Sequence, residues 1–274
     1  MSGATSGGRF ASRGVLVTGS TGMGAAAALA LASEGARVLV VGRDRGHLDA
    51  LAAAADALGT GIAAHAADLR DEASVEAAFA AFDARFGRLD AVYGVAGISG
   101  RRFGDGPLHQ ATLEGWDTVM ATNATSQFLV ARAAVQRMLG QPRDGAWGRG
   151  AILLMSTQLA SHPAARFFAT HAYAASKGAI ESLVRAAAAT YAPEGIRVNA
   201  IAPSLIATPM SRRAQTDKAI LAYLADKQPL AGGPIDADDV TPVALHLLSP
   251  DARMVTGQVV AVDGGWSVSE PRSG

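Results

Sequence analysis

The chain has 274 residues, of which 49% are hydrophobic, 18% are charged and none is cysteine. Its 24 basic and 24 acidic side chains cancel, so no bulk field attracts nucleic acid or an anionic membrane. The lack of cysteine excludes disulfides, thiol nucleophiles and thiolate metal sites, and we assign no metal ligands. No apolar run approaches the roughly 18 residues of a membrane span, so we expect a soluble, cytoplasmic protein.

Short β-branched runs alternate along the chain with long Ala/Leu-rich stretches, which is the pattern of βαβ units that build a parallel sheet. Most runs are continuously apolar, as expected for strands that helices cover on both faces. We therefore predict one doubly wound α/β domain with three layers (α/β/α) and a seven-stranded parallel sheet. The expected strands are residues 15–19, 37–42, 62–68, 89–97, 151–157, 197–203 and 257–265. The expected helices are residues 23–34, 45–58, 72–86, 113–139, 173–192 and 236–248.

The domain is expected to span residues 14–266. Residues 1–13 are Gly/Ser-rich without the apolar run of a signal peptide, so they predict a flexible tail, and residues 267–274 predict a second tail. Residues 204–234 interrupt the strand–helix rhythm just after a strand, where open α/β sheets bind ligands. Within them, residues 210–230 predict a lid of one or two helices with Ile220, Leu221 and Leu224 as its apolar face.

The stretch VTGSTGMGA (residues 17–25) joins the first strand to the first helix. Glycine permits positive φ and close backbone approach, and a helix N-terminus offers unpaired N–H groups to a phosphate. The same turn also fits a tight connection that binds nothing. The glycines allow several registers, and we align them as a phosphate turn made by Gly19, Ser20, Thr21, Gly22, Met23 and Gly24.

Two further strand ends carry the residues expected around an adenosine. Arg43 stands where dinucleotide folds often carry an acidic residue for the ribose 2′-hydroxyl. Its guanidinium cannot accept that hydrogen bond but suits a 2′-phosphate, which favours NADP(H) over NAD(H) unless Arg43 is only a solvated loop charge. Asp68 is placed to accept a hydrogen bond from the adenine amino group or to cap the next turn.

Tyr173 and Lys177 are four residues apart, so on a helix they share one face. A nearby ammonium lowers the pKa of a phenol, which can then give a proton to a carbonyl or take one from an alcohol. The preceding strand ends in Ser156 and Thr157, which offer a hydroxyl to a substrate oxygen. Asn123 lies in a long apolar helix, where its amide either satisfies a backbone kink or orders a water.

In chain order these motifs resemble the short-chain dehydrogenase/reductase family, in its single-domain branch, from Val15 to Gly265. The resemblance implies a Rossmann-type fold, a homotetramer, and NAD(P)H-dependent interconversion of a ketone and a secondary alcohol. It rests on VTGSTGMG, ADL (67–69), GVAG (94–97), TNAT (122–125), LMST (154–157), YAASK (173–177), IRVNAIAPSLIATPM (196–210) and VTGQVVAVDGG (255–265).

The resemblance also implies roles for individual residues. Tyr173 would be the general acid/base, Lys177 would lower its pKa and bind the nicotinamide ribose, and Asn123 would hold a water that relays protons to Lys177. Thr157 would take the place of the catalytic serine, ahead of Ser156, because strand alternation lets only one of the two face the cleft. The remaining cofactor contacts would be Asp68, Leu69, Ala96, Gly97, Pro203, Ile206 and Thr208.

The chain departs from the family's common pattern at several places. Its glycine turn is one residue short, and the usual Asn-Asn-Ala-Gly reads Gly94-Val95-Ala96-Gly97. Pro203-Ser204 replaces Pro-Gly, and threonine replaces the catalytic serine. Two alternatives therefore stand beside the oxidoreductase: a family member that catalyses epimerisation or dehydration, and a dinucleotide-binding protein without catalysis.

Substrate contacts are expected from two segments. The segment between Thr157 and Tyr173 is longer than is common in the family, and its side chains predict either part of a pocket lining or a surface loop. These side chains are His162, Arg166, Phe167, Phe168 and His171. Arg101 and Arg102, after the fourth strand, predict either contact with an anionic substrate or solvated charges.

Overall fold

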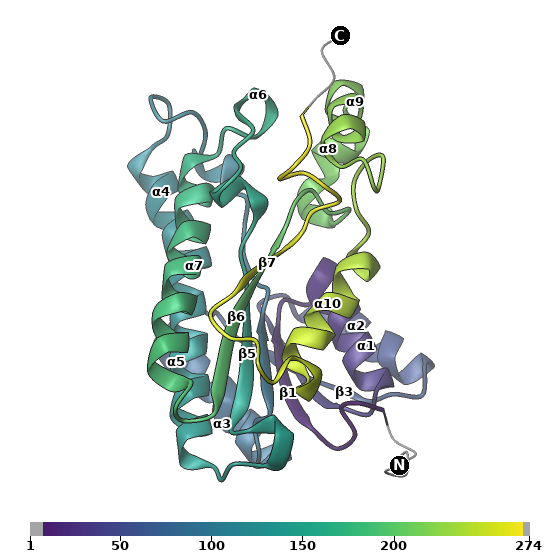
Figure 1. Ribbon diagram of the computed structural model, residues 1–274, viewed down its shortest axis with the longest axis vertical. Helices are drawn as coiled ribbons and strands as arrows, with labels where there is room; N and C mark the ends of the chain where they lie inside the picture. The colour runs from purple at the N-terminus through teal and green to yellow at the C-terminus, as the bar shows by residue number, and fades with distance from the viewer. Residues whose placement is uncertain (1–7, 271–274) are drawn as a thin grey trace.

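The computed structural model describes residues 8–270, in which seven parallel strands form one sheet between two layers of helices (Figure 1). The strand order is β3-β2-β1-β4-β5-β6-β7, so the chain starts near the middle of the sheet, winds to one edge and then crosses to the other. This is the doubly wound arrangement, and it confirms the predicted fold class.

The strands and helices alternate as expected. The strands are β1 (Gly14–Thr18), β2 (Arg37–Gly42), β3 (Ile62–Ala66), β4 (Ala91–Gly94), β5 (Gly150–Met155), β6 (Ile196–Pro203) and β7 (Val259–Val262). The helices that alternate with the strands are α1 (Gly22–Ser33), α2 (Arg45–Ala57), α3 (Glu72–Phe86), α4 (Leu113–Val119), α5 (Ser126–Gly140), α7 (His171–Tyr191) and α10 (Ala237–Leu248). Additional helices α6 (Ala165–Phe168), α8 (Arg212–Thr216) and α9 (Lys218–Lys227) follow β5 and β6 near the upper end of Figure 1.

Several predicted elements differ from the structure. The strand expected over residues 257–265 spans only Val259–Val262, and the helix expected from residue 173 begins at His171. The helix expected over residues 113–139 is divided by a π-helical segment, η2 (Met120–Thr125), which contains Asn123. The fourth strand ends at Gly94 instead of residue 97, because the next two backbone N–H groups leave the sheet ladder. The N–H groups of Val95 and Ala96 instead donate to the Thr18 hydroxyl, at 3.0 and 3.2 Å.

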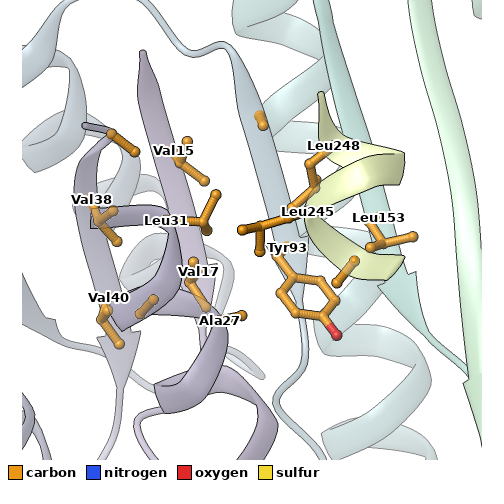
Figure 2. Close-up of a cluster of buried hydrophobic side chains, with 14 of the residues drawn as sticks. Val15, Val17, Ala27, Leu31, Val38, Val40, Tyr93, Leu153, Leu245 and Leu248 are labelled. Atoms are coloured by element: carbon orange, nitrogen blue, oxygen red, sulfur yellow. The ribbon is translucent and has the colours of Figure 1, made fainter. Parts of the chain in front are cut away.

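Alternating side chains of the strands fill two cores, one on each face of the sheet. Val15 and Val17 of β1 point to the face covered by α1, α2 and α10, whereas Leu16 between them points to α3, α5 and α7. Both faces are therefore buried, which explains the continuously apolar strand sequences. Figure 2 shows the first core, where Val15, Val17, Val38, Val40, Tyr93 and Leu153 of the sheet surround Ala27, Leu31, Leu245 and Leu248 of the helices.

The chain ends pack more closely than the sequence predicts. Phe10 is fully buried and meets Trp147 edge-on with ring centroids 5.5 Å apart, so the expected tail over residues 1–13 is wrong for its last part. Burial of a phenylalanine contributes about 1.5–3 kcal/mol. Backbone hydrogen bonds, such as that from Phe10 N to Glu34 O at 3.2 Å, also hold this segment on the domain. At the other end, the N–H of Ser267 donates to Asp263 at 3.0 Å. The outermost residues of both expected tails, 1–7 and 271–274, lie outside the described residues.

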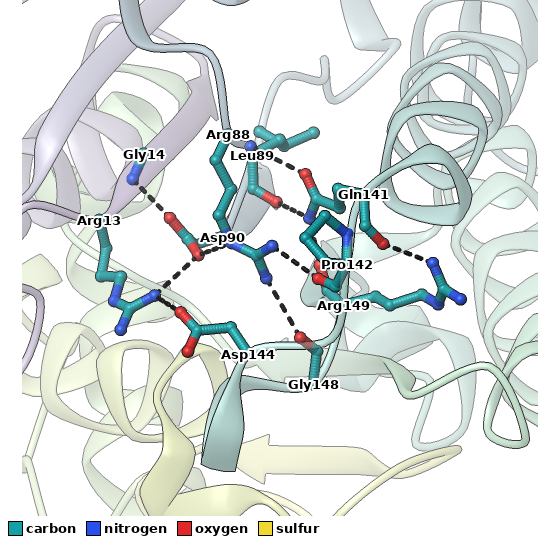
Figure 3. A network of polar contacts seen from close by, with 10 residues as sticks. All are labelled: Arg13, Gly14, Arg88, Leu89, Asp90, Gln141, Pro142, Asp144, Gly148 and Arg149. Carbon is teal, nitrogen blue, oxygen red and sulfur yellow. Dashed lines mark hydrogen bonds and ion pairs between the residues drawn. The ribbon is translucent and has the colours of Figure 1, made fainter.

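A network of charges ties together the amino ends of the neighbouring strands β1 and β4 (Figure 3). Asp90, only 1% exposed, accepts hydrogen bonds from Gly14 N (2.9 Å), Arg88 Nε (2.8 Å) and Arg13 Nη1 (3.3 Å). Arg88 also donates to the Pro142 carbonyl at 2.7 Å. The carboxylate of Asp90 is thus the common partner of two arginines and a strand, which gives it a structural role.

Among residues 8–270, no helix combines the length and the apolar composition needed to cross a membrane. The same residues contain no group of three or more His, Asp or Glu side chains placed to hold a metal ion.

Replacement of Asp90 tests the structural role of this network. Asp90→Ala leaves Arg88 and the Gly14 N–H without their buried partner, so the free energy of unfolding should fall by about 3 kcal/mol. Asp144→Ala removes a more exposed partner of Arg13 and should lower it by about 1 kcal/mol or less. Urea denaturation of both variants measures the difference, and equal losses would contradict the role assigned to Asp90.

Candidate active site

Two adjoining cavities lie at the carboxyl ends of the strands. A cavity of about 510 Å³ lies beside the glycine turn and the ends of β2 and β3. A larger cavity of about 670 Å³ lies between β5, β6, α7 and the segment that carries α8. Gly97, Thr208 and Arg102 line both cavities, so the two spaces meet along one wall.

Most predicted site residues line one of these cavities. The smaller cavity is lined by Gly19, Ser20, Thr21, Gly22, Met23, Arg43, Asp68, Leu69, Ala96, Gly97 and Thr208. The larger cavity is lined by Ser156, Thr157, Tyr173, Lys177, Pro203 and Ile206. Gly24 and Asn123 lie behind this lining, where they contact residues that belong to it.

The glycine turn leads into a helix start, the first turn of α1, that has no side-chain cap. Gly19 and Gly22 have positive φ values of +98° and +54°, and a Cβ on Gly24 would lie 2.2 Å from the Gly19 carbonyl oxygen. Thr21, the N-cap residue of α1, makes no side-chain hydrogen bond to the helix, and the first turn has no acidic residue. The free N–H groups and the positive end of the helix fit a pyrophosphate, so the shortened turn keeps both features of a phosphate site.

Basic side chains surround the far end of the smaller cavity. Arg43 lines it together with Arg70 and His47, which the sequence reasoning missed. Asp68 accepts from the Arg70 backbone N–H and from Arg70 Nε, both at 3.0 Å. These Arg70 hydrogen bonds are the largest cause that lowers the pKa of Asp68 to about 2. Asp68 therefore closes its own turn, one of the two roles considered for it, while it also lines the cavity.

The first turn of α7 is anchored by a carboxylate from another segment. Asp105, 6% exposed, accepts from Ala172 N at 3.0 Å and from Tyr173 N at 2.9 Å. One turn further along, Lys177 Nζ donates to the Met155 carbonyl at 2.8 Å and lies 5.8 Å from the centre of the Tyr173 ring. Tyr173 and Lys177 thus share one face of the helix, above the end of β5.

Burial controls the ionisation of this pair. Lys177 is 2% exposed, and desolvation lowers the pKa of its amine to about 7. Desolvation also raises the pKa of the Tyr173 phenol, although a hydrogen bond with Thr157 acts in the lowering direction. The expected lowering by Lys177 is therefore not the dominant influence in the structure, because burial disfavours both charged forms.

The two hydroxyls at the end of β5 have different partners. Ser156 donates to Glu181 Oε1 of α7 at 2.8 Å. Thr157 shares its hydroxyl with Tyr173 and contacts the Pro203 carbonyl oxygen at 3.4 Å. Ser156 is therefore committed to the packing of α7, whereas Thr157 is the hydroxyl beside the phenol.

Asn123 joins the π-helical segment to two neighbouring parts of the site. Its Oδ1 accepts from Ile98 N at 2.8 Å, and its Nδ2 donates to Ile98 O at 3.0 Å and to Ser176 Oγ at 3.1 Å. Gly97 allows this approach, because a Cβ there would lie 3.0 Å from Asn123 Oδ1 and 3.5 Å from Lys177 Nζ. Every polar group of the Asn123 amide is thus engaged within the protein.

Gln127 explains how the chain tolerates glycine at residue 94. Its side chain is fully buried, and its Nε2 donates to the Ala96 carbonyl at 3.0 Å. A Cβ on Gly94 would lie 2.0 Å from Gln127 Oε1, so the missing side chain makes room for this amide. A glutamine on the apolar face of the helix is the sequence feature that could have indicated this role, although the sequence alone did not single it out.

The segment expected to form a lid, residues 210–230, packs on a small core that it shares with neighbouring segments. Ile220 and Leu224 are fully buried with Trp266, whereas Leu221 is partly exposed. Phe167, Phe168, Tyr223 and Trp266 form a chain of aromatic contacts with centroids 5.3–6.4 Å apart. Of the five side chains proposed for the substrate pocket in this region, only Phe168 lines the larger cavity; His162, Arg166, Phe167 and His171 do not.

Comparisons with known proteins agree with this architecture. A family model described as enoyl-(acyl carrier protein) reductase matches residues 17–267. A solved short-chain type dehydrogenase/reductase from Mycobacterium ulcerans superposes with a TM-score of 0.86 at 30% identity, covering 95% of this chain and 92% of that one. This chain belongs to the short-chain dehydrogenase/reductase family.

Two curated relatives are similar to this chain over most of their length, one named as a dehydrogenase and one as an inactive dehydrogenase. A cis-4-hydroxycyclohexanecarboxylate dehydrogenase from Sinomonas cyclohexanicum is 35% identical over 94% of this chain and 98% of its own length. An inactive 2-(S)-hydroxypropyl-CoM dehydrogenase 2 from Xanthobacter autotrophicus is 35% identical over 85% of this chain and 96% of its own length. Membership of the family supports an oxidoreductase with a site for a nicotinamide dinucleotide.

The buried amine of Lys177 should make stability depend on pH in the cofactor-free protein. Its folded-state pKa of about 7 lies below the ordinary 10.5, so between these values the unfolded chain holds a proton that the folded chain has released. The free energy of unfolding should therefore rise with pH in this window, by up to about 1.4 kcal/mol per pH unit.

Urea denaturation at several pH values between about 7 and 10 measures this slope. Lys177→Met should flatten it, whereas the exposed Lys218→Met serves as the control and should keep it. An unchanged slope in Lys177→Met would show that another group carries the pH dependence.

Proposed function

We propose that this protein is an NADP(H)-preferring oxidoreductase that interconverts a ketone and a secondary alcohol where its two cavities meet. The observation that carries the proposal is the position of Tyr173, Lys177 and Thr157, which line the larger cavity beside Gly97, a residue shared with the cavity of the glycine turn. When bound, the nicotinamide supplies or accepts the hydride.

In this proposal, the residues of the chain hold the substrate oxygen and move its proton. The Tyr173 phenol gives a proton to the oxygen of a ketone, or takes one from an alcohol. The Thr157 hydroxyl, which already contacts the phenol, holds the same oxygen. Lys177 binds the nicotinamide ribose, and in its charged form it favours the phenolate.

Asn123 is proposed to support this proton path from behind the site. Both polar groups of its side chain are engaged by Ile98 and Ser176. We therefore propose that a water at this position is held by the main chain of the π-helical segment, while the amide fixes α7 in place. The protons would then pass from this water to Lys177.

The preference for NADP(H) is supported by the charges around the smaller cavity. Arg43, Arg70 and His47 contribute basic groups there, and the two acidic side chains are already engaged. Asp44 accepts from His47 N at 2.9 Å, and Asp68 pairs with Arg70. Asp68 is thus unavailable to a ribose 2′-hydroxyl and Asp44 is partly engaged, whereas a 2′-phosphate would meet the guanidinium of Arg43.

The relative named as inactive bears on the non-catalytic alternative. That alternative requires a chain that binds the dinucleotide without turnover, so steady-state consumption of NADPH by a ketone would exclude it. The same consumption would exclude epimerisation or dehydration without net redox change. By resemblance to the family, we also propose a homotetramer that works in the cytoplasm on a small-molecule substrate, without nucleic acid or membrane partners.

Removal of the phenol tests the proposed acid/base. Tyr173→Phe should lower kcat by roughly 10²–10⁴-fold, the usual range for a general acid/base, while NADPH binding stays within about twofold. Tyr191→Phe, at the far end of the same helix, is the matched control and should keep full activity. Unchanged turnover in Tyr173→Phe would remove this residue from the mechanism.

Removal of the guanidinium at residue 43 tests the cofactor preference. Arg43→Ala should weaken NADPH binding by about tenfold or more and leave NADH binding nearly unchanged, since a charged hydrogen bond to phosphate is lost. Arg45→Ala is the control, because Arg45 is exposed nearby but does not line the cavity. Fluorescence titration with both dinucleotides measures the effect, and equal weakening of both would contradict a 2′-phosphate contact.

A further inference from the structure

The cavity that contains Tyr173 has an unusual balance of charge. Arg101, Arg102 and Arg213 line it together with Lys177, and no Asp or Glu side chain belongs to its lining. Within the part of the chain that the structure describes, none of these three arginines forms an ion pair. In a chain whose total charge is zero, this is a local excess of positive charge.

Two of the arginines converge on a single carbonyl. Arg101 Nη2 donates to the Phe167 carbonyl oxygen at 2.8 Å, and Arg213 Nη2 donates to the same oxygen at 3.1 Å. Arg101 comes from the turn after β4 and Arg213 from α8, so the lid and the sheet each contribute one cation. Partial desolvation and the positive charge of Arg213 both lower the pKa of Arg101.

Asp105, the acidic group that acts on Arg101, does not neutralise this pair. Asp105 attracts Arg101, but both of its carboxylate oxygens accept hydrogen bonds from the first turn of α7. Two like charges held this close repel each other, and an anion placed between them would relieve that repulsion. Each guanidinium carries five N–H donors and uses one on Phe167, so donors remain for a ligand.

The rest of the lining suits a carbon skeleton. Apolar side chains line the same cavity as the arginines and the phenol, and they include Phe103, Leu159, Phe168, Leu205, Ile206 and Met210. A ligand that fills the cavity of about 670 Å³ would meet an apolar wall, a proton donor and a pair of guanidinium groups. Arg102 also lines the smaller cavity, so it is shared with the cofactor side.

We propose that Arg101 and Arg213 together bind a carboxylate of the substrate. The enzyme then reduces keto acids, or oxidises hydroxy acids, that have an apolar skeleton between the carboxylate and the reacting ketone or alcohol. Guanidinium groups bind carboxylates through paired, charge-assisted hydrogen bonds, which fix orientation as well as add affinity. This inference rests on the proposed ketone–alcohol chemistry and names the substrate class for the same site.

A series of methyl ketones with a terminal carboxylate, of increasing chain length, tests the proposal when each acid is compared with its methyl ester. With NADPH, at least one acid should exceed its ester in kcat/KM by roughly tenfold or more, because the neutral ester cannot form an ion pair or a bidentate contact with the guanidinium groups. Arg213→Gln and Arg101→Gln should each lower kcat/KM for that acid by roughly 10- to 100-fold, mainly through KM, and leave the ester within about twofold.

Arg212→Gln is the matched control, because Arg212 precedes Arg213 on α8, is exposed and does not line the cavity. It should behave like the unmodified enzyme. Esters that match their acids at every chain length would overturn the proposal, and so would an equal effect of Arg212→Gln. Weaker NADPH binding in Arg213→Gln and Arg101→Gln would also overturn it, because the arginines would then serve the cofactor.

A binding measurement separates this proposal from the proposed activity. If no ketone of either kind is turned over, the proposed function fails, and calorimetric titration of the acids into the protein with NADPH decides the anion site by itself. Binding of an acid but not its ester, lost in Arg213→Gln and retained in Arg212→Gln, would support the site. Equal binding of acid and ester would reject it.

Discussion

Helix α7 is fixed against the carboxyl end of β5, and the rest of the site depends on that contact. Asp105 holds its first turn, Lys177 bonds to the Met155 carbonyl, and Ser156 bonds to Glu181 two turns further along. Asn123 adds a bond from the π-helical segment to Ser176. Because the helix is held from several sides, the phenol of Tyr173 has a defined place in a cavity whose other walls come largely from turns and from the segment that carries α8.

Much of the fold could be predicted because each strand carries its pattern locally. Both faces of β1 and β2 are buried, so their sequences are continuously apolar, and the glycine turn marks the passage to α1. The π-helical break at Asn123 could not be placed, because the hydrogen bonds that accompany it come from Ile98 and Ser176, which are distant in sequence. The burial of Phe10 was missed for the same reason, since its partner Trp147 lies far along the chain.

The site residues show the same difference between features that are local in sequence and features that depend on distant contacts. Tyr173 and Lys177 were recognisable because helical spacing is a local property, and their positions relative to Gly97 follow from the fold. Gln127, Arg70 and Arg213 were missed because their meaning depends on contacts across elements: a gap above Gly94, a turn at Asp68 and a carbonyl at Phe167. Ionisation was also beyond the sequence, because desolvation of Lys177 is a property of the assembled core.

The departures from the family pattern are compensated by neighbouring groups. Loss of a side chain at residue 94 removes one amide, and Gln127 brings another to the Ala96 carbonyl from the facing helix. The shortened turn still places positive φ at Gly19 and Gly22, and Thr21 leaves the first N–H groups of α1 uncapped. The non-catalytic alternative drew its support from these two departures, so such compensation weakens it.

The two cavities share an excess of basic side chains. The chain is neutral in total, yet basic side chains gather at both cavities while the carboxylates there are paired or capping. A dinucleotide and a substrate carboxylate are both anions, and bound side by side they would repel each other. Arg102 lines both cavities, and Lys177 lines the larger one beside the phenol.

Burial lowers the pKa of Lys177 to about 7, so an anion bound near its amine would favour the charged form. That charge would in turn lower the pKa of Tyr173, so ligand binding itself would prepare the phenol for proton transfer.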